Sequence, residues 1–193
     1  MDEERYELRN ARVLASEAMA RLIRPGDTVV DATMGNGGDT LFLSKLVGEH
    51  GLVYAVDIQR DAMDRTKERL EAEGMGSRVR FSLLGHEHLS EIVSTPVRAV
   101  MFNLGWLPGG DHACTTHVDT TLSALEQACT LLLPGGMISV CVYPGHEEGT
   151  RELSAVEAFC MQLPVRQYTV LGSRFVNARP ETPRLFLIQK NKT

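Results

Sequence analysis

Two acidic residues and the turn between them are the part of the sequence best suited to binding a ligand. Asp31 follows the β-branched run 28–30, and Asp57 follows a second apolar run at 51–56. A carboxylate at the tip of a second strand can accept hydrogen bonds from both ribose hydroxyls of an adenosyl group. We therefore expect Asp57 to bind a ribose and Asp31, one strand earlier, to face a cationic end of the same ligand.

The turn between the two acids is rich in glycine and opens into a helix predicted at 41–46. Gly35 and Gly37 let the backbone approach a ligand closely because no Cβ atom stands in the way, and Asp39 or Thr40 could cap the helix. The spacing Gly-x-Gly-Gly differs from the Gly-x-Gly-x-x-Gly of dinucleotide sites, and no Gly-Lys-Ser/Thr follows as in a P-loop. The turn therefore predicts neither a dinucleotide site nor a P-loop.

Asn103 ends another strong strand pattern, at 97–103, and a loop rich in glycine and proline follows it. Open α/β sheets bind ligands and place reacting groups at this carboxyl edge. The amide carbonyl of Asn103 could accept hydrogen bonds from a substrate amine and hold its lone pair toward a methyl donor. Trp106, the only tryptophan, is either a core or lid aromatic or a platform for a stacked nucleobase, a contact worth about 1 to 3 kcal/mol.

Further polar residues follow the ends of the later strands. Asp111, Thr115 and Thr116 could line a polar substrate pocket in the loop after the fourth strand. His146 follows the fifth strand, predicted at 137–143, and it either faces the acceptor or hydrogen-bonds to backbone. The acceptor side of a site is therefore expected at the same sheet edge as the two acids.

His86 follows a third strand pattern, at 78–84, where a contact near an adenine ring is expected. It forms a His-x-His pair with His88, but no carboxylate or cysteine at ligand spacing accompanies the pair. The cysteines form no Cys-x-x-Cys motif, and several lie in apolar runs, at Cys114, Cys129, Cys141 and Cys160. The sequence therefore predicts neither a metal site nor a disulfide.

These residues need a sheet whose strands end at one edge. Strand patterns lie at 28–30, 51–56, 78–84, 97–103, 137–143, 165–171 and 184–189, and helical patterns at 5–24, 41–46, 60–74, 119–132 and 147–163. A tight turn is predicted at 133–136, and no helix separates the last two strands. The order predicts an α/β, Rossmann-like fold: a seven-stranded, mostly parallel sheet with helices on both faces and one antiparallel strand near an edge.

Composition limits the remaining possibilities. The chain has 193 residues, 43% of them hydrophobic, which suits one domain spanning 1–193. It has no run of roughly 18 apolar residues and no secretory pattern at its start, so we expect a soluble, cytoplasmic protein. The net charge of −5 gives no overall basic footprint, and an RNA substrate would have to meet a local basic patch. The arginines within 5–24 are interpreted as a solvated face, with contact to a phosphate backbone as the alternative.

Together the motifs resemble those of the YtqB-like (MnmM) family of class I S-adenosylmethionine-dependent methyltransferases, also labelled rRNA methylases. The segments that carry the resemblance are Asp31-Ala32-Thr33-x-Gly35-Asn36-Gly37-x-Asp39-Thr40, Val56-Asp57-Ile58-Gln59, the block from Phe102 to Asp111, the pair Thr115-Thr116, and Tyr143-Pro144-Gly145-His146-x-Glu148-Gly149. The segment from Asn103 to Trp106 is also similar to the Asn/Asp-Pro-Pro-Tyr/Phe motif of amino-directed methyltransferases, with Leu104-Gly105 in place of the prolines.

The resemblance implies S-adenosylmethionine as cofactor and S-adenosylhomocysteine as product. It implies N-methylation of 5-aminomethyl(-2-thio)uridine at wobble position 34 of tRNA, with the anticodon stem-loop as partner and a homodimer as one assembly. The residues implied for the cofactor are Asp31, Thr33, Gly35, Asn36, Gly37, Asp39, Thr40, Asp57, Gln59, His86 and Asn103, and those for the substrate are Leu104, Gly105, Trp106, Pro108, Gly109, Thr115, Thr116 and Tyr143. Asn103 would position the amine, and Asp111 or His146 would remove or relay its proton.

Three other functions fit part of the pattern. A methyltransferase of rRNA or of a small amine would keep the same motifs. A non-catalytic module that binds S-adenosylmethionine or a nucleotide would keep the glycine turn and the acids, but it would not need the polar edge around Asn103. An NAD-dependent oxidoreductase is disfavoured, because the sequence lacks both the glycine spacing and a Tyr-x-x-x-Lys pair.

Overall fold

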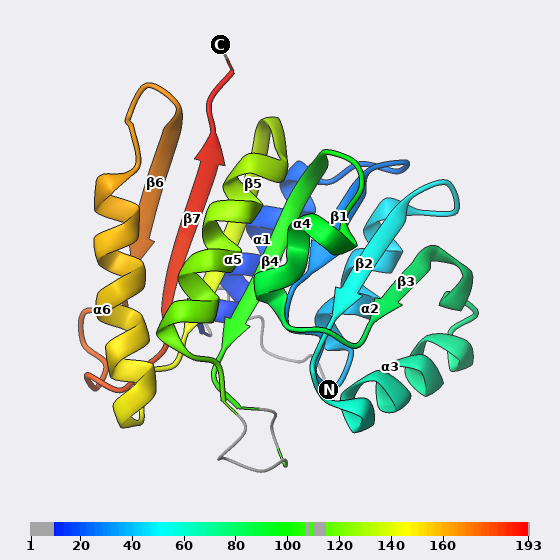
Figure 1. Ribbon diagram of the computed structural model, residues 1–193, viewed down its shortest axis with the longest axis horizontal. Coiled ribbons are helices and arrows are strands. Elements are labelled where there is room, and N and C mark those ends of the chain that lie inside the picture. The colour runs from blue at the N-terminus through cyan, green and yellow to red at the C-terminus, as the bar shows by residue number, and fades with distance from the viewer. Residues whose placement is uncertain (1–9, 107–108, 110–114, 193) are drawn as a thin grey trace, which may run out of the picture.

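A seven-stranded sheet in the order β3-β2-β1-β4-β5-β7-β6 runs through the middle of the molecule (Figure 1). The structure is a computed structural model that describes residues 10–106, 109 and 115–192. The strands are β1 (Thr28–Asp31), β2 (Leu52–Val56), β3 (Val79–Ser82), β4 (Val97–Leu104), β5 (Leu132–Val142), β6 (Tyr168–Ser173) and β7 (Arg184–Lys190). Within this sheet only β7 runs antiparallel to its neighbours, β5 and β6, which confirms the predicted mostly parallel sheet.

Helices cover both faces of the sheet, as predicted (Figure 1). On one face lie α1 (Ala11–Leu22), α2 (Gly38–Val47) and α3 (Arg60–Ala72), and on the other lie α4 (Leu89–Ile92), α5 (Val118–Leu131) and α6 (Glu147–Gln162). Two short 3₁₀ turns, η1 (Gly76–Arg78) and η2 (His86–His88), flank β3. Among the described residues, no helix combines the length and the apolar character needed to cross a membrane.

The strand residues alternate between two buried clusters because successive side chains of a strand point to opposite faces. Val29 packs in the cluster that contains Met19 of α1 and Leu43 of α2. Its neighbour Val30 packs in the other cluster, with Leu125 of α5. Each large apolar side chain buried in this way stabilises the fold by about 1.5 to 3 kcal/mol. Burial on both faces explains why the strands read as continuous apolar runs.

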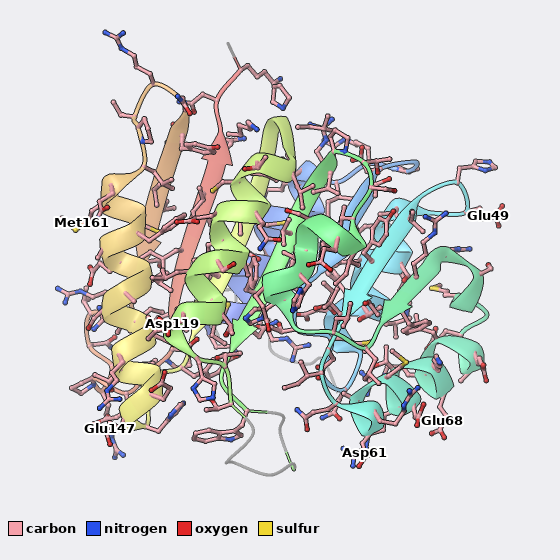
Figure 2. All side chains as sticks on the ribbon, in the orientation of Figure 1. Glu49, Asp61, Glu68, Asp119, Glu147 and Met161 are labelled. Carbon is pink, nitrogen blue, oxygen red and sulfur yellow. The ribbon has the colours of Figure 1, made fainter. Side chains whose placement is uncertain are left out.

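Exposed side chains lie at the periphery of these layers. In Figure 2, Glu68 of α3 and Glu147 and Met161 of α6 project away from the sheet. Met161 is 82% exposed although it is apolar. Single apolar residues of this kind are normal on protein surfaces.

Some element boundaries differ from the predictions. The helix predicted from residue 5 is described only from Ala11, where Asn10 caps it by accepting a 3.0 Å hydrogen bond from Val13 N. The last parallel strand begins at Tyr168 rather than at 165, because the amides of residues 167 and 168 bond back to the Pro164 carbonyl in a turn. The residues predicted as a turn at 133–136 lie within β5, where the pairing with β4 shifts register and Gly135 has a φ of +77°.

The predicted cap of α2 is wrong. The N-cap residue is Gly37, with φ +75° and no side-chain hydrogen bond, so neither Asp39 nor Thr40 caps the helix. Both side chains are instead used in contacts with the strands. Thr40 Oγ1 donates to Asp31 at the end of β1, and Asp39 accepts from Asn103 in β4. These contacts bind the start of α2 to the carboxyl edge of the sheet.

Candidate active site

A cavity of about 670 Å³ opens at the carboxyl edge of β1, β2, β4 and β5. On its cofactor side it is lined by the predicted residues Thr33, Gly35, Asn36, Asp39, Asp57, Gln59, His86 and Asn103. On its acceptor side it is lined by the predicted residues Leu104, Gly105, Trp106, Thr115, Thr116, Tyr143 and His146. The structure therefore brings most of the predicted site residues around one cavity.

Four predicted site residues lie away from the cavity lining, and two fall outside the described residues. Asp31, Gly37, Thr40 and the exposed Gly109 are described but do not line the cavity. Pro108 and Asp111 lie outside the described residues. The first three lie at the end of β1 and the start of α2, where they support the turn that does line it.

Asp57 holds the glycine turn against the end of β2. Its two carboxylate oxygens accept 2.9 Å hydrogen bonds from the backbone amides of Gly35 and Gln59. Thr66 of α3 donates a further hydrogen bond, of 3.1 Å, to the carbonyl of Gly35. Each carboxylate oxygen of Asp57 has a second lone pair, which leaves acceptor capacity for ribose hydroxyls.

Asp31 does not face the cavity as predicted. Its side chain is fully buried and accepts hydrogen bonds from Thr40 Oγ1 at 2.6 Å and from Thr33 N at 3.3 Å. Burial, together with the negative charge of Asp39, raises the pKa of Asp31 to about 7. The carboxylate that β1 and α2 present to the cavity is instead that of Asp39.

Asp39 joins three elements at the middle of the cavity. One of its oxygens accepts hydrogen bonds from Arg12 of α1, with distances of 3.0 Å to Nε and 2.9 Å to Nη2. Its other oxygen accepts a 2.7 Å hydrogen bond from Asn103 Nδ2. Arg12 also lines the cavity, so at this position the interpretation as a purely solvated face is incomplete. Its partner is distant in sequence, and no local pattern distinguished Arg12 from the other arginines within 5–24.

Four buried polar atoms of the cavity wall have no hydrogen-bond partner within the described part of the chain. They are His86 Nε2, Asn103 Oδ1, Thr115 Oγ1 and His146 Nε2. A buried polar atom without a partner costs about 1 to 3 kcal/mol, so such atoms are uncommon unless a ligand satisfies them. Burial lowers the pKa of His86, which favours the neutral ring that could accept or donate one hydrogen bond.

Two apolar residues at the cavity were not predicted. Ile58 follows Asp57, and Leu84 follows β3; both line the cavity although they are 58% and 45% exposed. Apolar surface beside a ribose-binding carboxylate and a neutral histidine fits the faces of an adenine ring. The donors and acceptors on this side therefore fit an adenosyl cofactor. The only signal in the sequence was an apolar residue after the strand-ending acid.

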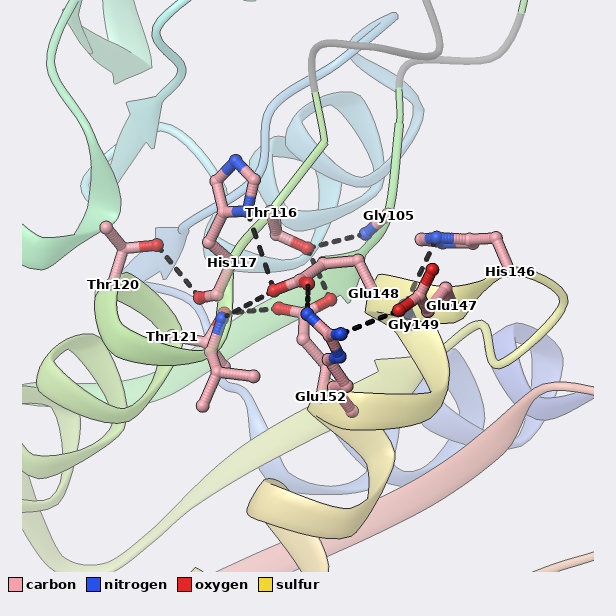
Figure 3. Close-up of polar contacts among 12 residues, drawn as sticks. Gly105, Thr116, His117, Thr120, Thr121, His146, Glu147, Glu148, Gly149 and Glu152 are labelled. Atoms are coloured by element: carbon pink, nitrogen blue, oxygen red, sulfur yellow. Dashed lines mark hydrogen bonds and ion pairs between the residues drawn. The ribbon is translucent and has the colours of Figure 1, made fainter.

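The acceptor side contains two aromatic rings in contact. The ring centroids of Trp106 and His146 are 4.3 Å apart with a tilt of 45°. His146 is also the N-cap of α6, where its Nδ1 accepts a 3.1 Å hydrogen bond from Gly149 N (Figure 3). Because a backbone amide can only donate, Nδ1 must be unprotonated, and a neutral ring then carries its proton on Nε2. A neutral His146 therefore has its donor at Nε2, which favours a donor role over the predicted role in removing or relaying a proton.

Comparison with known proteins identifies the family of this chain. Residues 53–189 match the family described as "Putative rRNA methylase". The chain is 43% identical over 195 residues to a chloroplastic tRNA (mnm(5)s(2)U34)-methyltransferase of Arabidopsis thaliana, covering 95% of this chain and 70% of the relative.

Two solved structures cover nearly the whole chain. A protein from Clostridium thermocellum described as a "putative rRNA-methylase" matches with a TM-score of 0.93 and 39% identity, covering 95% of this chain and 98% of its own. A Streptococcus mutans protein described as "a putative methyltransferase", in complex with SAH, matches with a TM-score of 0.86 and 33% identity, covering 95% of this chain and 99% of its own. The family match covers more than half of the chain. As the sequence motifs predicted, this chain belongs to the "Putative rRNA methylase" family of class I methyltransferases.

Proposed function

We propose that this chain is an S-adenosylmethionine-dependent N-methyltransferase that converts 5-aminomethyl(-2-thio)uridine at wobble position 34 of tRNA into 5-methylaminomethyl(-2-thio)uridine. The observation that carries the proposal is the buried Asn103 Oδ1, an acceptor without a partner among the described residues, on the wall between the cofactor and acceptor sides. The name of the Arabidopsis relative supports the choice of nucleoside.

The cofactor side is assigned to S-adenosylmethionine, which when bound supplies an electrophilic methyl group on a sulfonium. Asp57 would accept hydrogen bonds from the ribose, and Ile58 and Leu84 would contact the adenine faces. His86 would hydrogen-bond to the adenine edge through Nε2. Asp39 would place negative charge near the cationic end of the cofactor, the role predicted for Asp31. The bound S-adenosylhomocysteine of the Streptococcus mutans relative supports this assignment.

The acceptor side is assigned to the modified uridine. Asn103 Oδ1 would accept a hydrogen bond from the amine and aim its lone pair at the methyl group, which supplies proximity and orientation. A primary alkylamine is largely protonated at neutral pH, so a base must remove one proton before transfer. Asp111 is the proposed base, because His146 presents a donor. We propose that His146 Nε2 donates instead to a carbonyl or thiocarbonyl of the base.

Trp106 is proposed as the stacking platform of the base, together with the neighbouring substrate residues Leu104, Gly105, Pro108, Gly109, Thr115, Thr116 and Tyr143. Its ring lines the cavity and is held by the contact with His146. The partner would be the anticodon stem-loop of tRNA, which meets the enzyme where the wobble base enters. A cytoplasmic location and a homodimer stay predictions.

The test is methyl transfer from labelled S-adenosylmethionine to total tRNA from cells blocked after the 5-aminomethyl stage, followed by nucleoside mass analysis. We expect 5-methylaminomethyl nucleosides to appear with the wild-type chain and not with Asn103→Ala. Parallel reactions with rRNA and with small alkylamines test the other acceptors. Labelled rRNA or a labelled small amine, with unmodified tRNA, would replace the proposed substrate while retaining the cofactor.

A further inference from the structure

We propose that Glu152 is a positioning residue for the acceptor side of the cavity, acting through Thr116 on the backbone of Gly105. Glu152 lies in the second turn of α6 and its side chain is fully buried. Its oxygens accept a 2.7 Å hydrogen bond from Thr116 Oγ1 and a 2.6 Å hydrogen bond from Thr121 Oγ1 (Figure 3). The importance of this position for catalysis rests on the proposed function of Asn103, two residues before Gly105.

The carboxylate sets the direction of a hydrogen-bond chain. A threonine hydroxyl has one proton, and Thr116 donates it to Glu152, which as a carboxylate can only accept. The Thr116 oxygen is then left to accept from Gly105 N, at 2.9 Å. The amide of Thr116 in turn donates to the Gly105 carbonyl at 3.2 Å. Both backbone polar groups of Gly105 are therefore fixed by one residue, and that residue is fixed by Glu152.

Gly105 is a point at which the backbone needs such support. Its φ is +140°, a conformation that residues with a side chain rarely adopt. The next residue, Trp106, pairs with Thr115 in an antiparallel bridge. The chain thus leaves β4 and returns toward α5 through two adjacent pairs, Gly105 with Thr116 and Trp106 with Thr115. A shift of these two residue pairs would move both the Trp106 ring and the end of β4 that carries Asn103.

Burying the carboxylate of Glu152 costs free energy, and no ion pair among the described residues offsets that cost. Among the described residues no cationic side chain forms an ion pair with it. Burial raises the pKa of Glu152, and the hydrogen bonds from the two threonines only oppose that rise. A buried carboxylate without a cation is an expensive means of packing α6 against α5. A role in orienting Thr116 gives a reason for an acceptor-only group at this position.

The test compares two threonines that bond to the same carboxylate. Thr116→Val and Thr121→Val each remove one hydrogen bond to Glu152, but only Thr116 also holds Gly105. We expect Thr116→Val to lower kcat by about tenfold to hundredfold, as for a small displacement of a reacting group. Thr121→Val should lower the free energy of unfolding by about as much as Thr116→Val does, but it should keep kcat within about twofold of wild type. The affinity for S-adenosylmethionine should be unchanged in both.

Glu152→Leu tests the same hydrogen-bond chain from a residue that cannot contact the substrate directly, because Glu152 does not line the cavity. It should reproduce the loss seen with Thr116→Val, and the double variant should be no worse than either single variant. Acrylamide quenching of Trp106, the only tryptophan, reports the same displacement without any substrate. Altered quenching in Glu152→Leu and Thr116→Val but not in Thr121→Val supports the proposal even if tRNA proves not to be the acceptor. Equal quenching and equal kcat in Thr116→Val and Thr121→Val would overturn it.

Discussion

Asn103 and Asp39 are joined by a 2.7 Å hydrogen bond that fixes which end of the asparagine amide faces the cavity. A carboxylate only accepts hydrogen bonds, so the group directed at Asp39 must be the NH₂ of the amide. The second oxygen of Asp39 is bound by Arg12, which prevents the carboxylate from turning away. The carbonyl of Asn103 is consequently the end available to a ligand, and an amine is a suitable partner.

Asn103→Ala should leave the affinity for S-adenosylmethionine nearly intact and lower turnover by about 10²- to 10³-fold, the range for loss of one oriented polar group in an active site. Asn103→Asp should be at least as inactive, because it places a second carboxylate at 2.7 Å from Asp39. Isothermal titration with cofactor and single-turnover methyl transfer separate the two effects. Turnover close to wild type in Asn103→Ala would reject the assigned role.

Asp31 should make stability depend on pH. Its pKa of about 7 lies above the ordinary value of 3.8, so the folded state binds its proton more tightly than the unfolded state. The resulting stabilisation is fully present below about pH 3.8 and is lost as the pH rises through about 7. Asp31→Asn removes this titration. Its stability relative to wild type, measured by urea unfolding, should therefore improve between pH 5 and pH 8.

The test uses how the stability difference between Asp31→Asn and wild type changes with pH, and not the size of that difference at any one pH. Asp31→Asn also disturbs one of the two hydrogen bonds that the Asp31 side chain accepts, which lowers the stability of the variant. Asp27→Asn is a useful control, since Asp27 is a partly buried acid outside the cavity. A difference between Asp31→Asn and wild type that stays constant with pH would contradict a raised pKa at Asp31.

The sequence predicted the site residues that lie at the ends of strands. Asp57 and Asn103 each end an apolar run, and parallel strands bring such positions to one edge. Arg12 could not be found this way, because its partner Asp39 is distant in sequence. Local propensity also favoured Asp39 as a helix cap, and the tertiary contact with Asn103 overrode it.

Glu152 shows that one further signal was available. It precedes Val156 and Cys160 at intervals of four residues, and all three are buried on one face of α6. An acid in register with an apolar stripe is unusual, because the same helix face normally packs in the core. Such a position can be recognised from the sequence, but its partners Thr116 and Thr121 are defined only by the packing of α5 against α6.

Gly37→Ala should destabilise the chain more than Gly74→Ala. Both glycines have positive φ, +75° and +68°, so both substitutions carry a backbone cost of about 1 to 2 kcal/mol. At Gly37 the new Cβ would also lie 2.7 Å from the side chain of Thr66, whereas at Gly74 nothing lies within 4 Å. Since Thr66 donates to the Gly35 carbonyl, cofactor affinity should fall only in Gly37→Ala. Equal unfolding free energies in the two variants would contradict the steric argument.

The neutral His146 ring should carry its proton on Nε2 rather than on Nδ1. Protonation of Nδ1 would direct two N–H groups at each other, because Gly149 N donates to this atom, and would remove the N-cap of α6. Long-range ¹H–¹⁵N NMR of histidine-labelled protein measures the tautomer directly. A neutral ring with its proton on Nδ1, which leaves Nε2 as an acceptor, would rule out the donor role proposed for His146.

Two substitutions of His146 separate its structural role from its contact with the substrate. Asn is a good N-cap, so His146→Asn should retain the stability of α6, whereas His146→Ala should lose about 1 kcal/mol. Both variants lose Nε2 and the contact with the Trp106 ring, so both should raise KM for RNA by a similar factor. The proposed donor role involves no proton transfer through this ring, so the alkaline limb of the kcat profile should stay in place in both. A KM that rises in His146→Ala alone would assign His146 to helix capping only.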